Sequence, residues 1–140
     1  MLSQPLRGLM ARDKMVTATP QATVLEVAGL MLAHGIGAVM VVENGALTGI
    51  FSKRDVVVRV VAQGRNARRV RVGEVMTAHP VSVDPDVTFG RALLLMQEHG
   101  VRHLPVVENG KPIGMVAARV ALDPELEEFV CEVHRRETFR

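Results

Sequence analysis

The sequence predicts a single body of mixed helix and sheet, built from two tandem repeats that pack with pseudo-two-fold symmetry. The first observation is that the pentapeptide VVENG stands at 41–45 and again at 106–110. Sliding the chain by this spacing of 65 residues lays 16–57 over 81–122 without a gap, and fourteen of the forty-two positions are identical. Self-similarity at a fixed period indicates a repeat architecture. Short lead-in segments precede the repeats at an offset one residue longer, at 6–10 and 72–76.

Each repeat is predicted to fold as helix, hairpin and helix. In repeat 1, Thr23 and Glu26 have the spacing of a capping box, and apolar residues then recur with helical spacing. Asn44-Gly45 lies between two apolar runs and predicts a tight hairpin turn, because both residues tolerate positive φ. Ser52 then begins a second helix, which we expect to end at Gly64.

Repeat 2 follows the same order, with a helix over 88–99 and a hairpin turn at Asn109-Gly110. The first hairpin strands, AVMVV and LPVV, are apolar on both faces, so we expect each sheet to be covered on both sides. A unit of about fifty residues seldom buries such surfaces alone. The two repeats are therefore expected to pack on each other, with clefts at their junction.

The tail and the domain limits complete the organisation. Asp123-Pro124 predicts the start of a C-terminal amphipathic helix, which would pack on the body or on a second subunit. The predicted divisions are repeat 1 with its lead-in and linker at 1–70, repeat 2 at 71–123, and the C-terminal helix at 124–140.

Length and composition bound the class of protein. The 140 residues are about one domain's worth, and 48% of them are hydrophobic, which is enough for a core. No apolar run approaches the ~18 residues of a membrane span, and the N-terminus lacks the apolar core of a signal peptide. The single cysteine, Cys131, excludes an internal disulfide and suits a reducing compartment. We therefore expect a cytoplasmic protein with no membrane partner.

Taken together, the motifs resemble those of a CBS-domain pair, also called a Bateman module. They are the lead-ins ending in Met, the helices ending in His-Gly, the stretch RHLPVV-NG, and GIFSKRD at 49–55; the resemblance covers about residues 6–123. It implies an α+β fold with two clefts between the repeats. It also implies a regulatory module that binds an adenosine compound such as AMP, ADP, ATP or S-adenosylmethionine. The resemblance implies that an adenine nucleotide acts as a regulatory ligand. It implies no obligatory cofactor. The resemblance further implies a homodimer and an unidentified partner protein that the module regulates.

The segment 49–55 is suited to such a ligand. Ser52 stands at the start of a helix, and Asp55 follows three residues later on the same face. A carboxylate accepts hydrogen bonds from both vicinal hydroxyls of a ribose, and a serine hydroxyl with free helical N–H groups suits a phosphate. Lys53 and Arg54 add positive charge. In the family, the matching Ser/Thr and Asp have these roles. The same pattern is also how an ordinary helix caps itself, so the heptapeptide alone leaves both interpretations open.

Repeat 2 favours the ligand interpretation, because Ala117 and Val120 stand where Ser52 and Asp55 stand in repeat 1. A cap required by the fold would be expected in both repeats. The resemblance places the Ser/Asp pair opposite the other repeat's first strand and the strand before its VVENG. The predicted ligand site comprises Gly49, Ile50, Ser52, Lys53, Arg54, Asp55, Thr77, Ala78, Pro80, Val81, Val101, Arg102 and His103. The second cleft, predicted to be degenerate, comprises Val16, Thr17, Gly37, Ala38, Ala117 and Val120.

The histidines, the candidate catalytic groups and the basic linker give weaker evidence about function. His34 and His99 each precede a glycine at a predicted helix end, where they suit the helix dipole better than a metal. His99 and His103 are four residues apart but separated by a helix stop, so we expect no metal site. The sequence offers no nucleophile with a plausible base and no paired carboxylates, so we expect no enzyme. The alternative function is nucleic-acid binding through the basic linker 65–71, although this patch lacks aromatic residues to stack on bases. The linker arginines are Arg65, Arg68, Arg69 and Arg71.

Overall fold

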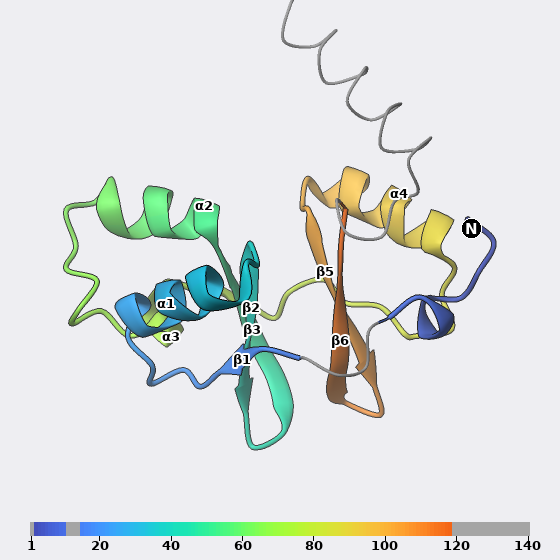
Figure 1. The fold of residues 1–140 in the computed structure, drawn as a ribbon, viewed down its shortest axis with the longest axis horizontal. Coiled ribbons are helices and arrows are strands. Elements are labelled where there is room, and N and C mark those ends of the chain that lie inside the picture. The colour runs from blue at the N-terminus through green and yellow to red at the C-terminus, as the bar shows by residue number, and fades with distance from the viewer. Residues whose placement is uncertain (1, 11–14, 119–140) are drawn as a thin grey trace, which may run out of the picture.

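The structure, a computed structural model, describes residues 2–10 and 15–118. It has two lobes, and the junction where repeat 1 and repeat 2 face each other is called the seam (Figure 1). One lobe holds α1, α2 and the hairpin of repeat 1, and the other holds α4 and the hairpin of repeat 2. The pseudo-two-fold arrangement predicted from the sequence is confirmed. The predicted helix over 124–140 and Val120 of the second cleft lie outside the described residues.

The first helix of repeat 1, α1 (Val24–His34), begins and ends as its sequence predicts. The Glu26 N–H donates to Thr23 Oγ1 at 3.2 Å, and the Thr23 N–H donates to Glu26 Oε2 at 3.3 Å, so the capping box is complete. Gly35 ends the helix with φ 61°, a left-handed conformation that glycine adopts without steric cost. The buried face of α1 consists of Val24, Val27 and Met31.

The sheet of repeat 1 is an antiparallel hairpin extended on both sides. Strands β2 (Ala38–Glu43) and β3 (Ala46–Ser52) turn at Asn44-Gly45, where both residues have positive φ. β1 (Thr17–Ala18) pairs parallel with β2, and β4 (Thr77–Ala78) pairs antiparallel with β3, giving the order β1-β2-β3-β4. The first four residues of β2 are buried, which confirms that this strand is covered on both faces.

The segment after β3 is helical, but it is wider than an ordinary α-helix. One turn, α2 (Lys53–Asp55), leads into a π-helical segment, Val56–Val61. The backbone bond from the Ala62 N–H to Val57 O spans five residues. Three consecutive β-branched valines at 56–58 crowd an α-helix, and this wider winding relieves the crowding. The helical segment stops at Gly64 with φ 66°, as expected.

Repeat 2 has the same first helix and hairpin as repeat 1, but among the described residues its sheet has two strands where that of repeat 1 has four. Helix α4 (Phe89–His99) is capped by Thr88, whose hydroxyl accepts from the Arg91 N–H at 3.2 Å. Strands β5 (His103–Glu108) and β6 (Lys111–Ala117) turn at Asn109-Gly110. Each hairpin has a register shift immediately before the second valine of VVENG. The hairpin turns and first helices predicted for both repeats are therefore confirmed.

Each lead-in packs against the opposite repeat, which the division of the sequence at residue 70 does not anticipate. The short helix η1 (Leu6–Gly8) places Leu6 in the core of repeat 2, while α3 (Val72–Val75) places Val72 in the core of repeat 1. The backbone bonds match: the Leu6 N–H donates to Val87 O, and the Val72 N–H donates to Ala22 O. This reciprocal exchange ties the two repeats together.

Arg7 adds polar contacts between the N-terminal lead-in and repeat 2. Its guanidinium donates hydrogen bonds to Glu108 and, at 3.3 Å, to Asp86. These contacts, the one with Glu108 first, raise the pKa of Arg7 further above its usual value. Gly73 occupies the corresponding place in the other lead-in, so this ion pair belongs to one repeat alone among the described residues.

Candidate ligand site at the seam

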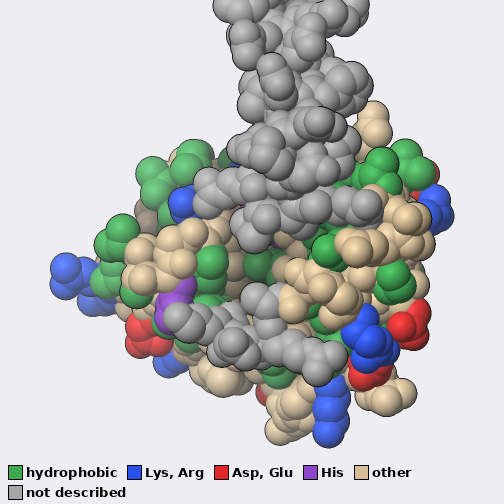
Figure 2. All heavy atoms as spheres, turned by 45° about the vertical axis from the view of Figure 1, so that its right-hand side comes forward, with side chains coloured by type: hydrophobic (Ala, Val, Ile, Leu, Met, Phe, Trp, Pro, Cys, Tyr) green, Lys and Arg blue, Asp and Glu red, His purple; other side chains and the backbone are tan. Residues whose placement is uncertain are grey.

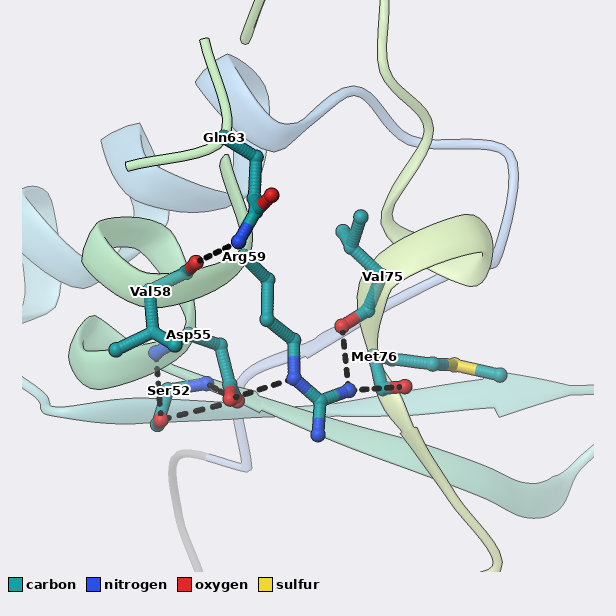
Figure 3. A network of polar contacts seen from close by, with 7 residues as sticks. All are labelled: Ser52, Asp55, Val58, Arg59, Gln63, Val75 and Met76. Atoms are coloured by element: carbon teal, nitrogen blue, oxygen red, sulfur yellow. Dashed lines mark hydrogen bonds and ion pairs between the residues drawn. The ribbon is translucent and has the colours of Figure 1, made fainter. Parts of the chain in front are cut away.

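Ser52 and Asp55 form a complete helix cap at the end of β3 (Figure 3). The Asp55 N–H donates to Ser52 Oγ at 3.2 Å. In return, Asp55 Oδ2 accepts from the Ser52 N–H at 2.9 Å and from the Ser52 hydroxyl at 3.0 Å. The capping interpretation of this pair is therefore realised in the structure.

The cap leaves acceptor capacity on the Asp55 carboxylate. An ionised carboxylate has about four acceptor sites on its two oxygens. The two bonds from Ser52 both go to Oδ2, and Oδ1 contacts Arg59 Nε at 3.5 Å. Because Oδ1 accepts no other hydrogen bond from the described residues, capping and ligand binding are compatible.

Arg59 is a residue of this site that the sequence predictions missed. Its Nη1 donates to Val75 O at 3.0 Å and to Met76 O at 3.1 Å, both in the lead-in of repeat 2. Figure 3 shows the guanidinium between the Asp55 carboxylate and these two carbonyls. The available signal was its position four residues after Asp55, a spacing at which helical side chains meet.

The first strand segment of repeat 2 forms one wall of the site. Strand β4 pairs with β3 so that Ala78 lies opposite Gly49, and Thr77 lies opposite Ile50. The structure thus brings these four predicted residues together beside Ser52. A Cβ atom on Gly49 would overlap with the sulfur of Met76, and it would lie 3.0 Å from the carbonyl oxygen of Thr77. Glycine at this position is what allows the two repeats to approach closely.

His103 enters from the other repeat. Its ring lies against Gly37, since a Cβ built on Gly37 would be 3.2 Å from His103 Nε2 and Cε1. The Gly37 carbonyl accepts from the Lys53 N–H at 3.0 Å, and Ala38 pairs with Ser52 in the hairpin. Gly37 and Ala38, which the sequence assigned to the second cleft, therefore lie beside residues assigned to the first.

The remaining residues predicted for the ligand site make no polar contact with Ser52 or Asp55 within the described chain. Val81 packs against the core of repeat 2, and Val101 and Arg102 are exposed before β5. Between Ala78 and Pro80, His79 adopts φ 49°, a conformation that a residue before proline seldom takes, and its N–H donates to Thr48 O. Within the described chain, no hydrogen bond or ion pair joins Pro80, Val81, Val101 or Arg102 to Ser52 or Asp55.

The residues predicted for a second cleft lack a Ser/Asp pair, because Ala117 and Val120 stand at those positions of the sequence. Ala117 ends β6 opposite His103, in the register that Ser52 has opposite Ala38. The alignment of Ala117 with Ser52 therefore holds in space as well as in sequence. Thr17 lies in β1 and Val16 packs against the core of repeat 1.

Two cationic side chains follow Ser52 directly in the chain. Lys53 and Arg54 are exposed on the first turn of α2. Two of the linker arginines make contacts within the fold: the Arg71 guanidinium donates to Gln21 O, and the Arg65 guanidinium lies 3.9 Å from the Glu74 carboxylate.

Among the described residues no group of three or more His, Cys, Asp or Glu side chains is placed to hold a metal ion. None of the described helices combines the length and apolar character needed to cross a membrane.

Comparison with known proteins agrees with this architecture. The CBS domain family matches the chain twice, over residues 6–62 and 72–122. The CBS domain-containing protein YhcV of Bacillus subtilis is 39% identical over 104 residues, which is 74% of each chain. The chain belongs to the CBS domain family. Pairs of such domains are regulatory modules.

Two further relatives define how far the likeness extends. An uncharacterized protein of Methanopyrus kandleri is 38% identical over 120 residues, covering 84% of this chain and 61% of that protein, so this chain spans less than two thirds of that relative. The solved CBS domain pair of protein MJ0100 has a TM-score of 0.75 and 20% identity, over 83% of this chain and 90% of that one. It shares the fold. That protein is in complex with 5′-methylthioadenosine and S-adenosyl-L-methionine.

Proposed function

We propose that this protein is a ligand sensor that binds an adenosine compound at the seam between its repeats and relays occupancy to a partner protein. The site comprises Ser52 and Asp55 with the wall formed by β4 and His103. AMP, ADP, ATP and S-adenosylmethionine are the candidate ligands. The adenosine compound acts as a regulatory ligand, and we place the module in the cytoplasm on the strength of its single cysteine.

The observation that carries the proposal is that the Asp55 carboxylate uses Oδ2 for the helix cap and leaves Oδ1 able to accept further hydrogen bonds. Its side chain is 16% exposed, and its Oδ1 faces the lead-in of repeat 2 beside Arg59. An acceptor at such a position, next to a serine hydroxyl at a helix start, suits the hydroxyls of a ribose. The fold supports the same ligand class, since a protein of this fold holds two adenosine compounds.

Binding without turnover fits the groups at the seam. Asp55 Oδ2 is taken up by the helix cap, and Oδ1 lies 3.5 Å from Arg59 Nε with acceptor capacity left for a ligand hydroxyl. A general base must reach the proton that it removes, and a nucleophile must have such a base beside it. The Ser52 hydroxyl donates to Asp55 Oδ2 at 3.0 Å, but the same hydroxyl accepts from the Asp55 N–H, so this contact is arranged as a helix cap. We therefore propose a regulatory role with no catalytic step.

Apolar side chains on the outer helices support self-association as part of this function. Figure 2 shows apolar side chains at the surface of both lobes. On the helices of repeat 1, Leu32 is 86% exposed and Val61 is 65% exposed. Exposed apolar side chains of this kind suit a protein interface, and we propose a homodimer. Light scattering should give twice the chain mass; a monomer across the assay range would contradict this part of the proposal.

The direct test is to identify what the protein binds. The purified protein is denatured and the released small molecules are analysed by mass spectrometry; an adenosine compound at near-stoichiometric amount is expected. In parallel, AMP, ADP, ATP and S-adenosylmethionine are titrated by calorimetry into protein freed of ligand. A ligand at 100 times its dissociation constant should stabilise the fold by about 2.7 kcal/mol. Release of no adenosine compound, together with no heat of binding for all four, would refute the proposed function.

A further inference from the structure

Arg59 joins three elements at the seam (Figure 3). It lies in the π-helical segment after α2, its Nε is 3.5 Å from Asp55 Oδ1, and its Nη1 donates to Val75 O and Met76 O in the opposite lead-in. A guanidinium is planar and rigid, so fixing Nη1 at two carbonyls also fixes the direction of Nε. Arg59 therefore connects the Asp55 carboxylate to the backbone of repeat 2.

The pair differs from an ordinary surface ion pair. Exposed pairs at this spacing contribute little, because water screens both charges. Here the Asp55 side chain is 16% exposed and the Arg59 side chain is 44% exposed. The two carbonyl contacts hold the arginine without help from the carboxylate. The geometry thus constrains Oδ1 rather than merely neutralising it.

The sequence of repeat 2 lacks this pair. At the offset of 65 residues, Asp55 corresponds to Val120 and Arg59 corresponds to Pro124. Neither residue of the pair is kept there, although the caps, turns and strand glycines recur in both repeats. The carboxylate and the arginine are therefore present together in one repeat and absent together in the other.

We propose that Arg59 is a positioning residue for the ligand's ribose: it holds Asp55 Oδ1 toward the seam and makes that orientation depend on the lead-in of repeat 2. The inference rests on the proposed function and deepens it. The carboxylate is one planar group: the bonds from Ser52 hold its Oδ2 end, and Arg59 restrains its Oδ1 end. A ribose hydroxyl that bonds to Oδ1 then meets an acceptor that is already oriented, and preorganisation of this kind increases affinity.

The test measures the preference for ribose over deoxyribose in Arg59→Met. Methionine keeps an unbranched apolar stem but is shorter than arginine and has no donors. AMP and 2′-deoxyAMP are titrated by calorimetry into wild type and variant. We expect AMP affinity to fall about tenfold, the equivalent of one lost charge-assisted hydrogen bond. The 2′-deoxyAMP affinity should fall less, so the ratio between the two ligands shrinks. Arg59→Lys should lie between, because a single ammonium cannot match the fork of three contacts.

Two controls separate positioning from other effects. Arg91→Met removes one positive charge from a 3.9 Å surface pair on α4 and should bind both nucleotides as wild type does; an equal loss in this variant would reduce the Arg59 effect to net charge and overturn the inference. In the double variant with Asp55→Ala, the losses should overlap, so that it binds AMP about as weakly as Asp55→Ala alone. Additive losses would indicate a general structural role and would also overturn it.

The outcomes distinguish the two proposals. If wild type binds AMP in a manner that depends on Asp55, but Arg59→Met keeps the wild-type ratio of AMP to 2′-deoxyAMP affinity, only the role of Arg59 is refuted. If wild type binds none of the four adenosine compounds, the proposed function fails, and the role assigned to Arg59 fails with it. A reduced ratio in Arg59→Met, with Arg91→Met unchanged, supports both.

Discussion

The two repeats have one backbone plan, but they differ where the second hairpin strand ends. The hydroxyls of Thr23 and Thr88 each accept the N–H of the residue three positions on, and both hairpins turn through Asn-Gly with the same register shift. In repeat 1, Ser52 and Asp55 form a helix cap after β3. In repeat 2, Ala117, at the end of β6, and Val120 stand at the corresponding positions of the sequence. Features found in both repeats are those that the fold needs. A polar group found in one repeat is a candidate for function.

The exchange of lead-ins is a shared feature, and its removal should have the largest effect. Leu6 is fully buried in the core of repeat 2. Leu6→Ala should lower the free energy of unfolding by about 3 kcal/mol, since a buried Leu→Ala change loses both transfer energy and packing. Val72→Ala in the matching lead-in should cost somewhat less. Urea denaturation measures both, with the exposed Leu32→Ala as a control that should change little.

A small effect of Leu6→Ala, comparable to that of Leu32→Ala, would mean that the N-terminal lead-in does not pack in the core of repeat 2. The shared part of the comparison would then be wrong. A loss in Leu6→Ala with none in Val72→Ala would instead break the symmetry of the exchange.

The strand glycines give the next effect and sharpen the comparison. Gly49 and Gly114 occupy equivalent places, each beneath a lead-in methionine. Gly49→Val should cost about 3 kcal/mol, because the new side chain meets the Thr77 backbone as well as the Met76 side chain. Gly114→Val should cost about 1–2 kcal/mol, because the nearest atom is the flexible Met10 sulfur at 3.1 Å. Equal losses in thermal denaturation would show that the two lead-ins approach equally closely.

The smallest effect is expected at Arg7, whose ion pairs with Asp86 and Glu108 occur in one repeat alone among the described residues. Arg7→Met should shift the melting temperature only slightly at low salt, and the shift should vanish near 1 M salt, where the Debye length is about 3 Å. Differential scanning calorimetry at two salt concentrations tests this. A large shift that persists at high salt would show that this asymmetric contact is structural after all.

The sequence predicted what depends on neighbouring residues. The cap at Thr23, the helix stop at the glycine after His34, and both Asn-Gly turns are local, because each is decided within about four residues. The repeat itself also revealed the pseudo-symmetry. These predictions are confirmed by the structure.

The remaining features depend on residues far apart in the chain. The packing of Leu6 against repeat 2 and the contacts of Arg59 with Val75 and Met76 arise only once the two repeats have met. Their sequence signals are a lone leucine and an arginine at helical spacing, which occur in many helices for other reasons. The candidate site was therefore predicted at Ser52 and Asp55, where a motif exists, and missed at Arg59, where none does.

The central claim is that Asp55 binds a ribose as well as capping its helix, and calorimetry on Asp55→Ala tests it most directly. AMP and 2′-deoxyAMP are titrated into wild type and variant, and the melting temperature of each protein is measured without ligand. The variant loses two charge-assisted bonds to the ribose, each worth roughly 1.5–3 kcal/mol, so AMP affinity should fall at least about tenfold. The 2′-deoxyAMP affinity should fall less. The ligand-free fold should survive with a loss of about 1 kcal/mol, the cost of an incomplete cap. Unchanged AMP affinity in a variant that melts at a much lower temperature would show that Asp55 is a helix cap alone.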